Sequence, residues 1–431
     1  MANTTIHIDN KEHAVIIGAQ WGDEGKGKVS DYFSSAYNVS CRFSGGDNAA
    51  HTAVHNNIKH VFRILPVSAL NANTVLLTSH VVFDPLLLVE EIKHYSELVK
   101  EFKLIIDHRS HLVLPYHRKI DRGWEHWRGE LPLKSIRRGI GPCCADRTDR
   151  IGLRAGDLLD LSLLRENLEK FVPMKTKMLS HILGCQESLF TSKAIYNELV
   201  NCAKILGQYI GDTTHFFNTY NDRLLFIFEG AQGTLLDNSH GLYPFVAAYS
   251  TVSTAIFPSL GVPAFPLRCI GVVAAYTTQI GNAPFPTEQN NDSGRILQKR
   301  GKEISRDGYL RRCGWLDLNI VKYSATINGF TELALTKIDV LDKLDEIPIC
   351  IGYKLDGKSI KQFPNTVTVL QKCEPIYETL PGWKTSTRSI YRYDDLPSQA
   401  KQFIEFIEKA IDIPVILVST GPDREDTILR L

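Results

Sequence analysis

The segment GAQWGDEGKGKVSDYF, residues 18–33, brings glycine, acidic and lysine residues together directly after a short apolar run. Gly22, Gly27 and Lys28 fit the G-x4-G-K part of a phosphate-binding loop. Glycines let backbone N–H groups converge on an anion, and a following helix presents its positive end to that anion. The motif by itself also fits a glycine-rich turn with solvated lysines. The apolar run before it and the helical pattern after it favour a phosphate site.

Two features of this segment depart from the usual loop. Val29 stands where a phosphate-binding loop has a Ser or Thr hydroxyl for magnesium, and Asp23 puts a carboxylate inside the loop. Lys26 and Lys28 supply positive charge that can neutralise phosphate. The sequence therefore raises the question of which group replaces the missing hydroxyl.

A second glycine-rich segment, FSGGDNAAHT at residues 43–52, carries polar groups among small side chains. Paired glycines let the backbone approach a ligand closely. Asn48 supplies an amide and His51 an imidazole. A single histidine is more often structural than catalytic, so the interpretation of His51 depends on its neighbours.

Two segments predict a base-binding site. LALTKIDVLD, residues 333–342, leads from an apolar run into Lys337 and Asp339, in the manner of the NKxD guanine-reading element of GTP-binding proteins. A carboxylate accepts hydrogen bonds from guanine N1–H and the 2-amino group, which adenine lacks, and the lysine stem covers the base face. Near the C-terminus, residues 419–422 form a second turn after an apolar run, where they would close the other side of the base.

A fourth segment, FEGAQGTLLD at residues 228–237, again places glycines after an apolar run. Gln232 lies between Gly230 and Gly233. Its side chain would hydrogen-bond a base edge or cap the turn, and the local sequence favours neither interpretation.

Composition limits the class of protein. The chain has 431 residues, of which 43% are hydrophobic, 49 basic and 48 acidic, so nothing attracts it generally to nucleic acid or to a membrane. Nine scattered cysteines without a CxxC pair favour reduced thiols over a disulfide framework. There is no signal-peptide pattern and no apolar run near the roughly 20 residues that span a bilayer. We therefore expect a cytoplasmic protein with a flexible tail at residues 1–12.

Short apolar runs alternate with helical patterns along the chain. Strands are expected at residues 14–17, 74–77, 104–106, 224–228, 270–275, 333–336 and 414–418, and helices at 85–100, 161–183, 193–210 and 398–411. This alternation predicts an α/β fold with a large, mostly parallel central sheet and flanking helices, and ligands at the carboxyl ends of the strands. No linker is evident, so a single domain over residues 1–431 is expected. The polar segment 281–314 reads as a long functional loop.

Together these motifs resemble the adenylosuccinate synthetase family, which joins IMP and aspartate with GTP. QWGDEGKGK (residues 20–28) is the signature of that family, and FEGAQGTLLD, FPTE, GWLD, LTKIDVLD, EPIYETLPGW and STGPDR follow in the family's order. The resemblance covers residues 14–431. It implies a P-loop-like GTP-binding ligase fold and a homodimer in purine biosynthesis, with small-molecule substrates and one Mg²⁺ per subunit.

The resemblance also implies which residues act. Asp23 aligns with a residue that is both magnesium ligand and catalytic base, so it takes the place of the missing hydroxyl, and a second metal contact falls on the Ala50 carbonyl. His51 aligns with the catalytic acid, and Lys26 and Gln232 complete the catalytic set. The implied GTP-binding residues are Gly22, Asp23, Glu24, Gly25, Lys26, Gly27, Lys28, Ala50, His51, Thr52, Arg311, Lys337, Ile338, Asp339, Ser419, Thr420 and Gly421.

The departures from the family pattern lie in the IMP and aspartate half. A phosphate-binding threonine falls on Ile136, a second substrate-binding threonine on Ala247, and a nucleotide-binding arginine on Tyr309; the histidine before Asn48 is Asp47. IMP binding is expected to be weaker than in an ordinary member unless nearby arginines compensate. The implied substrate positions are Asn48, Ile136, Arg150, Gln232, Ala247, Ser305, Arg306, Asp307, Gly308, Tyr309 and Arg311.

Three interpretations follow from this pattern. The favoured one is a synthetase that has rebuilt its IMP contacts; the others are a paralogue with a different acceptor or amine, and a GTP-binding protein that no longer ligates. Retention of Asp23 and His51 argues against the last, because binding alone needs no proton carrier. Arg150 is expected to reach the partner subunit's site in a homodimer.

Overall fold

The computed structural model describes residues 12–55, 58–129, 133–182, 184, 190–304, 308, 310–360 and 362–430. The expected tail, apart from Glu12, lies outside the described residues. So do four of the expected substrate residues: Ser305, Arg306, Asp307 and Tyr309.

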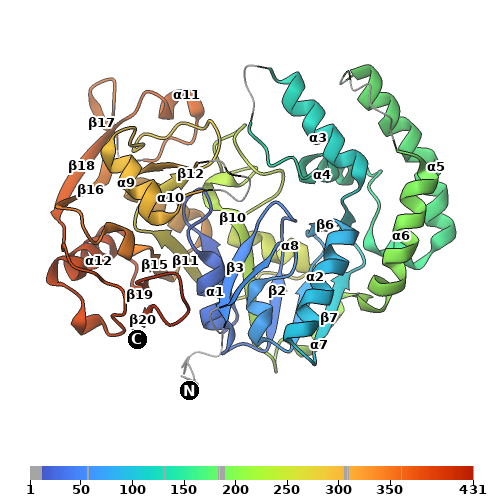
Figure 1. Cartoon of the computed structure of the whole chain (residues 1–431), viewed down its shortest axis with the longest axis horizontal. Helices are drawn as coiled ribbons and strands as arrows, with labels where there is room; N and C mark the ends of the chain where they lie inside the picture. The colour runs from blue at the N-terminus through green and yellow to red at the C-terminus, as the bar shows by residue number, and fades with distance from the viewer. Residues whose placement is uncertain are drawn as a thin grey trace.

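A ten-stranded sheet runs through the middle of the described chain (Figure 1). Its strands, in spatial order, are β20 (Thr427–Leu429), β19 (Val415–Ser419), β15 (Glu332–Thr336), β11 (Arg268–Ala274), β1 (Ala14–Gly18), β10 (Phe226–Gly233), β2 (Val39–Arg42), β5 (Thr74–Leu77), β7 (Lys103–Asp107) and β9 (Ile210–Gly211). All neighbouring strands pair in parallel except β19 and β20, which are antiparallel.

Smaller sheets and the helices surround this sheet. The smaller sheets are β3 (His51–His55) with β4 (Ile58–Phe62), β6 (Val82–Phe83) with β8 (His111–Leu112), β12 (Thr277–Gln279) with β13 (Arg312–Gly314), and β14 (Leu316–Asp317), β16 (Glu346–Leu355), β17 (Lys358–Ile360) and β18 (Glu374–Pro381). The helices are α1 (Lys26–Ser34), α2 (Pro85–Leu98), α3 (Pro115–Trp127), α4 (Ile140–Asp149), α5 (Leu161–Lys177), α6 (Ser192–Leu206), α7 (Thr213–Tyr220), α8 (Ile256–Leu260), α9 (Asp292–Gly301), α10 (Leu318–Asn328), α11 (Val367–Leu370) and α12 (Ser398–Ile411).

The predicted mostly parallel sheet is confirmed, and all seven expected strands belong to it. The sequence missed β2, β9 and β20, which are short and carry too little apolar pattern to be recognised. The four expected helices are present, although α5 ends at Lys177 and continues as a single π-helical turn, Met178–Ile182. The expectation of an irregular loop over 281–314 is wrong, since it contains α9, capped by the Asn291 side chain on Gly294 N at 3.2 Å.

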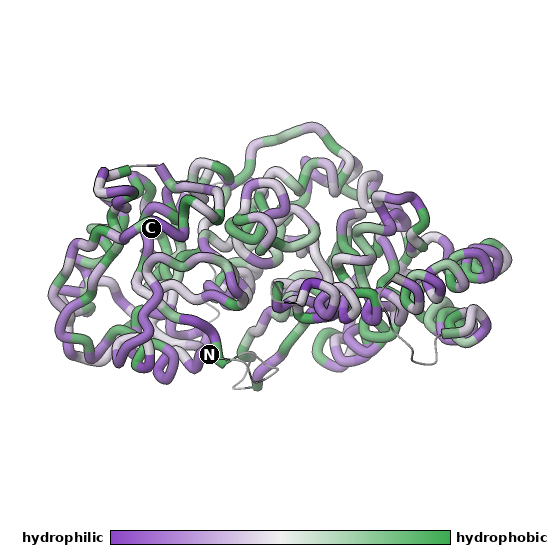
Figure 2. Tube along the Cα trace, turned by 90° about the horizontal axis from the view of Figure 1, so that it is seen from above, coloured by the Kyte–Doolittle hydropathy of each residue, from purple (hydrophilic) through white to green (hydrophobic). Residues whose placement is uncertain are grey.

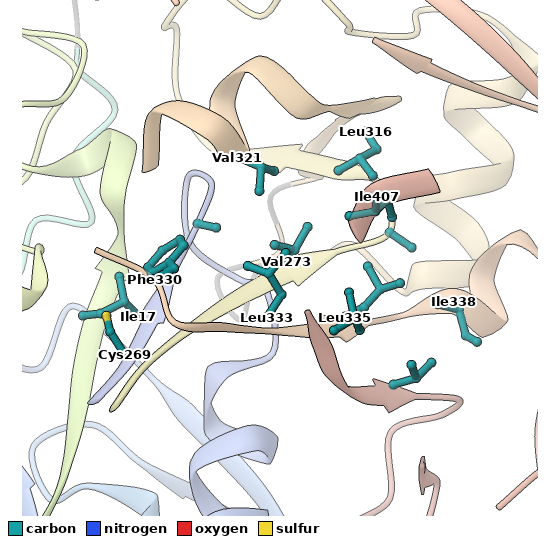
Figure 3. Packing of buried hydrophobic residues seen from close by; sticks show 14 of the residues in the cluster. Ile17, Cys269, Val273, Leu316, Val321, Phe330, Leu333, Leu335, Ile338 and Ile407 are labelled. Atoms are coloured by element: carbon teal, nitrogen blue, oxygen red, sulfur yellow. The ribbon is translucent and has the colours of Figure 1, made fainter. Parts of the chain in front are cut away.

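Both faces of the main sheet are covered, which explains why its strands read as continuous apolar runs. In β15, Leu333 and Leu335 point into one cluster with Val321 and Ile407 of α10 and α12 (Figure 3). Ala334 points to the opposite face, into a cluster with residues of α1. In Figure 2 the helical coils at the right-hand end, α5 and α6, alternate between purple and green, as expected of helices with one buried face.

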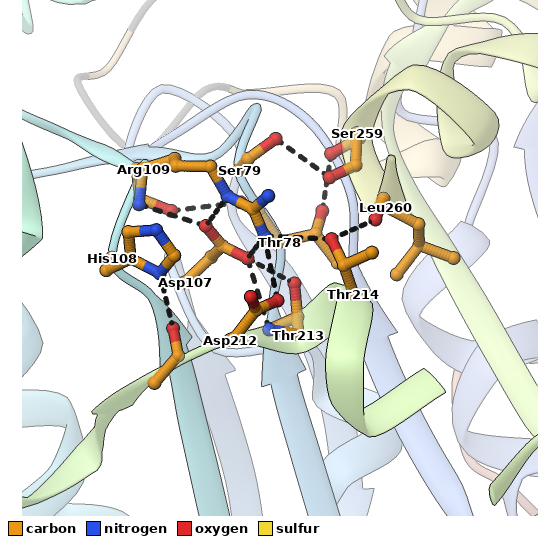
Figure 4. A network of polar contacts seen from close by, with 12 residues as sticks. Thr78, Ser79, Asp107, His108, Arg109, Asp212, Thr213, Thr214, Ser259 and Leu260 are labelled. Atoms are coloured by element: carbon orange, nitrogen blue, oxygen red, sulfur yellow. Dashed lines mark hydrogen bonds and ion pairs between the residues drawn. The ribbon is translucent and has the colours of Figure 1, made fainter. Parts of the chain in front are cut away.

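The carboxyl edge of β7 is closed by a polar network (Figure 4). The buried Asp107 carboxylate accepts two hydrogen bonds from the Arg109 guanidinium, both at 2.8 Å, and one from the Thr213 hydroxyl at 2.5 Å. Arg109 also contacts Asp212 at 3.0 Å, the residue that caps α7. Because these groups satisfy one another, the network fixes β7 against α7.

The other half of the carboxyl edge gathers the motifs of the sequence. The phosphate loop follows β1, Gln232 lies at the end of β10, Lys337 follows β15 and Ser419 ends β19. These strands lie close together in the sheet, so segments hundreds of residues apart meet at one edge. No helix in the described part of the chain is both long enough and apolar enough to cross a membrane.

Asp317 gives the fold a testable pH dependence. Its buried carboxylate caps α10 and accepts a hydrogen bond from Tyr353 at 2.5 Å. Burial raises the pKa of Asp317 to about 6, against the opposing hydrogen bond. The folded state therefore favours the protonated acid, and its contribution to stability is lost as pH rises from about 4 to about 6.

We expect Asp317→Asn to flatten the pH dependence of the unfolding free energy over this window by roughly 1–3 kcal/mol. Urea unfolding at several pH values measures it. Asp292→Asn, at a carboxylate that is 87% exposed, is the control and should follow the wild-type curve. Parallel curves for Asp317→Asn and wild type would contradict the expectation.

Candidate active site

The gathered loops enclose a cavity of about 560 Å³. Its lining is rich in cations: Lys26, Lys28, Lys59, Arg63, Arg300, Lys302, Arg311, Lys337 and Arg388. From the expected sites it includes Asp23, Gly25, Gly27, Asn48, Ala50, His51, Thr52, Ile136, Gln232, Asp339, Ser419 and Gly421. So many cations in one cavity suit a ligand with several phosphate charges.

Not every expected residue faces this cavity. Gly22, Glu24, Ile338 and Thr420 of the GTP set and Arg150, Ala247 and Gly308 of the substrate set are absent from its lining. Glu24 is buried beneath the phosphate loop, where its carboxylate accepts from Gln20 N at 3.0 Å and Gly22 N at 2.8 Å. It also pairs with Lys26 at 2.5 Å. Glu24 therefore shapes the loop and holds Lys26 in place.

The phosphate loop packs directly against the segment that carries His51. A Cβ atom on Gly27 would lie 2.9 Å from the backbone of Thr52, so only glycine permits this approach. On its other side the loop is tied to β15, because the Thr336 hydroxyl donates to Glu24 O at 2.5 Å. The loop thus joins the predicted catalytic segment to the predicted base-binding strand.

Asp23 lies at the centre of the site on left-handed backbone, with φ of 59°. Its carboxylate, 40% exposed, forms an ion pair with Arg311 Nε at 2.7 Å. Burial alone would lower the pKa of Arg311, but the carboxylates of Asp23 and Glu303 raise it. Asp23 and the exposed Ala50 offer a carboxylate and a backbone carbonyl in the same cavity, and such oxygen donors fit the Mg²⁺ that the sequence predicts.

His51 has a buried carboxylate partner that the sequence analysis missed. Its Nδ1 contacts the Glu229 carboxylate, which also accepts from Val67 N and Ser68 N at 3.1 Å each. Burial lowers the pKa of His51, and the attraction to Glu229 opposes that shift. The signal was available, since Glu229 is an acid inside the apolar run of β10, and an acid buried in a central strand needs a partner.

The base-binding residues also have partners. Lys337, on left-handed backbone with φ of 61°, donates to Glu303 at 2.6 Å. The Asp339 carboxylate contacts Arg388 Nη2 at 3.1 Å, and burial raises the pKa of Asp339 against that attraction. Neither Glu303 nor Arg388 was identified from the sequence, because each lies far along the chain from its partner.

Lys28 lines the cavity, and its ammonium also has partners in the C-terminal turn that the sequence analysis missed. Its ammonium donates to Ser419 Oγ, Gly421 O and Asp426 O, each at 2.7 Å. Burial lowers the pKa of Lys28 to about 8. The ammonium fixes the 419–426 turn, because three polar acceptors of that turn surround it. The phosphate-binding role of Lys28 stays a prediction.

The acceptor half contains both retained and altered residues. The Asn48 amide and the Tyr249 hydroxyl bond each other at 3.0 and 3.2 Å, and Gln232 Nε2 donates to Asn48 O at 3.4 Å. Ile136 faces the cavity, 41% exposed, and offers no donor. Ala247 packs half-buried against an apolar cluster. Weaker IMP binding stays a prediction.

One cavity thus brings together the phosphate-loop motif, the predicted acid–base pair and the predicted base-binding residues, as expected of a nucleoside-triphosphate-dependent enzyme. A protein-family model described as adenylosuccinate synthetase matches residues 15–428. The chain is 40% identical over 427 residues to the synthetase of Koribacter versatilis (98% of this chain, 96% of that protein). It is 39% identical over 419 residues to the synthetase of Heliobacterium modesticaldum, and that match covers 96% of this chain and 98% of the other protein. The chain belongs to the adenylosuccinate synthetase family.

Solved structures agree. The fully ligated adenylosuccinate synthetase of Plasmodium falciparum matches with a TM-score of 0.92 and 32% identity, covering 97% of this chain and 100% of that one. The succinoaminodeoxyadenylate synthetase of cyanophage S-2L shares the fold, with a TM-score of 0.58 and 19% identity. Family membership confirms the expected ligase class, with GTP as co-substrate and Mg²⁺ as cofactor, and favours neither alternative.

The position of Lys28 leads to a test in the free protein. Lys28→Met removes three charge-assisted bonds, so amide hydrogens in residues 420–427 should exchange roughly 10- to 100-fold faster. Hydrogen-exchange mass spectrometry without nucleotide measures this. Lys204→Met, at an exposed helical lysine, is the control. Unchanged protection of the turn would show that Lys28 does not hold it.

The His51–Glu229 contact predicts a shifted pH profile. If His51 acts as an acid, the rate falls as pH rises through its pKa. Glu229→Gln removes the attraction that raises this pKa, so the alkaline limb of kcat should move to lower pH by about one unit. Glu91→Gln is the matched control, because buried Glu91 accepts only backbone N–H groups in the described contacts, from residues 63–65. If the pH profiles of kcat were the same for Glu229→Gln and Glu91→Gln, the assignment of His51 as the acid would be contradicted.

Proposed function

We propose that this chain joins IMP and L-aspartate with GTP, giving adenylosuccinate, GDP and phosphate. The observation that carries the proposal is one cavity that holds Asp23, His51 and the pair Lys337 and Asp339. A proton acceptor and a proton donor lie at the phosphate end, and a guanine reader lies at the other end. A protein that only bound GTP would need the reader without the proton carriers.

The proposed first step activates the hypoxanthine. Asp23 removes the N1 proton, so negative charge develops on O6. That oxygen attacks the γ-phosphorus as the bond to the β-phosphate oxygen breaks and GDP leaves. Lys26 and the N–H groups of the phosphate loop stabilise the negative charge on the phosphoryl group during its transfer. His51 donates a hydrogen bond to an oxygen of that transferring group.

The proposed second step forms the C–N bond. The aspartate amine attacks C6 of the 6-phosphoryl intermediate, the C6–O bond breaks, and phosphate leaves while the nitrogen loses a proton. Phosphorylation is needed because oxide is a poor leaving group and phosphate a good one. Gln232 and Asn48, which contact each other beside Asp23, would position the purine.

Asp23 and the Ala50 carbonyl are the residues that would hold Mg²⁺. When bound, the ion neutralises phosphate charge. For Asp23 to serve in this way it must release Arg311, whose guanidinium would then be free to contact phosphate oxygens.

We further propose a single-domain chain that acts as a cytoplasmic homodimer. One hydrophobic cluster includes residues from Val15 to Ile428, in keeping with one cooperative unit. The eight cysteines in the described residues are all unpaired, as expected of a reducing compartment. Arg150, exposed at the end of α4 and outside its own cavity, is available to the partner's site.

The direct test is product formation. Purified protein with GTP, Mg²⁺, IMP and L-aspartate should yield adenylosuccinate, detected by mass spectrometry, and omission of any one component should abolish it. Absence of product with all four present would overturn the proposal. Product with another purine nucleotide alone would instead support the paralogue interpretation.

Donor specificity gives a sharper prediction. Asp339→Asn replaces an acceptor-only group with an amide that can also donate, which suits xanthine better than guanine. We expect kcat/KM to fall by about 100-fold with GTP and to recover in part with XTP, as a lost charge-assisted pair of bonds implies. Asp345→Asn, at an exposed carboxylate, is the control. Equal use of ATP and GTP by the wild type would refute the assignment of Asp339.

A further inference from the structure

Glu303 is a buried carboxylate with charged partners on both sides. Its side chain is 1% exposed. One oxygen accepts from Lys337 Nζ at 2.6 Å and from the Tyr276 hydroxyl, and the other accepts from Arg311 Nη1 at 3.1 Å. Neither the family signature motifs nor the mechanism above assigns Glu303 a task.

Each charged partner belongs to a different part of the nucleotide site. Lys337 follows β15 and precedes Asp339, the proposed guanine reader. Arg311 lies next to β13 and pairs with Asp23 at 2.7 Å. The side chains of Lys337, Glu303, Arg311 and Asp23 thus form one chain of alternating charge, from the base end of the cavity to the phosphate end.

We propose that Glu303 is a positioning residue for the donor nucleotide: it holds Lys337 along the base and Arg311 beside the phosphates. The inference rests on the proposed function, because it takes GTP as the ligand of this cavity. Glu303 also gives Arg311 a second anionic partner besides Asp23, which makes the Asp23 carboxylate easier to release for Mg²⁺.

The positions of the backbone near Glu303 do not depend on its carboxylate. Glu303 N donates to Gln298 O at 2.9 Å, and Arg311 N donates to Glu303 O at 3.0 Å. The Gln298 side chain adds a bond to Arg311 O at 2.8 Å. Glu303→Gln, which keeps the shape and removes the charge, should therefore leave the local fold intact.

The charge balance around Arg311 changes in that variant. With Glu303 neutral, Asp23 is the one remaining ion-pair partner of Arg311 among the described residues. A tighter Arg311–Asp23 pair would compete with Mg²⁺ for the carboxylate. Lys337 would lose its anionic anchor at the same time and would sample other rotamers. Both changes weaken GTP binding, and the first raises the Mg²⁺ concentration that binding requires.

The experiment compares Glu303→Gln with Glu332→Gln. Glu332 lies at the opposite end of β15, where its carboxylate pairs with the Arg268 guanidinium at 2.6 Å. The control therefore removes an ion pair at the first residue of β15, away from the cavity. Calorimetry with a non-hydrolysable GTP analogue, over a Mg²⁺ titration, measures affinity without turnover. KM values for GTP and IMP and the melting temperature complete the comparison.

We expect Glu303→Gln to weaken the analogue at least tenfold, to raise the Mg²⁺ concentration for half-maximal binding severalfold, and to leave KM for IMP within twofold. Glu332→Gln should match the wild type in all three. Glu303→Asp keeps the charge and should recover part of the lost affinity, which a packing role would not produce.

Analogue affinity within twofold of wild type in Glu303→Gln would overturn the inference. So would an equal loss of GTP and IMP affinity with a lowered melting temperature, because that pattern marks a general structural role. If the wild type bound the analogue normally but did not ligate, the proposed function would be refuted. The binding data alone would then decide the inference on Glu303.

Discussion

The site depends on buried carboxylates that hold its cations in place. A cavity built for polyphosphate needs several positive side chains, and these repel one another before the ligand arrives. Glu24 pairs with Lys26, and Glu303 pairs with Lys337 and Arg311, while Glu229 holds the ring of His51. Glu24 and Glu303 are almost fully buried, so their attraction to the neighbouring cations is little screened by solvent. The free protein thus keeps its phosphate-binding groups in fixed positions.

The parallel sheet makes this arrangement possible. Strands β1, β10, β15 and β19 end at the same edge, so four loops from distant parts of the chain meet there. Hydrogen bonds then lock the loops to one another: Thr336 bonds the phosphate loop, and Lys28 bonds the 419–426 turn. A shift of any one of these loops therefore displaces the loops bonded to it. This coupling is a physical basis for linking recognition of the base to chemistry at the phosphate.

Ion pairs in the free site also oppose binding to a small degree. Arg311 pairs with Asp23, and Arg388 pairs with Asp339, so in the proposed mechanism both carboxylates exchange partners when nucleotide and metal arrive. Such exchanges keep each carboxylate satisfied before binding and lower the net gain from the new contacts. Glu303 limits this effect at Arg311, because it offers the guanidinium a second anionic partner.

The sequence alone determined the fold class and the strands at residues 14–17 and 333–336, and it predicted which segments meet at the cavity. These follow from local patterns: an apolar run long enough for a buried strand, glycines, and polar residues directly after the run. The family motifs fixed the roles expected of Asp23 and His51, because such motifs are compact in sequence.

Only the tertiary structure decided the partners of those residues. Glu229 lies 178 positions from His51, Glu303 lies 34 positions from Lys337, and the turn that holds Lys28 lies 391 or more positions along the chain. No local pattern encodes these pairings, since they arise where separate strands end side by side. The same reason explains why the turn contacts of Lys28 were missed: the sequence shows a lysine in the loop, but the acceptors that surround its ammonium come from the opposite end of the chain.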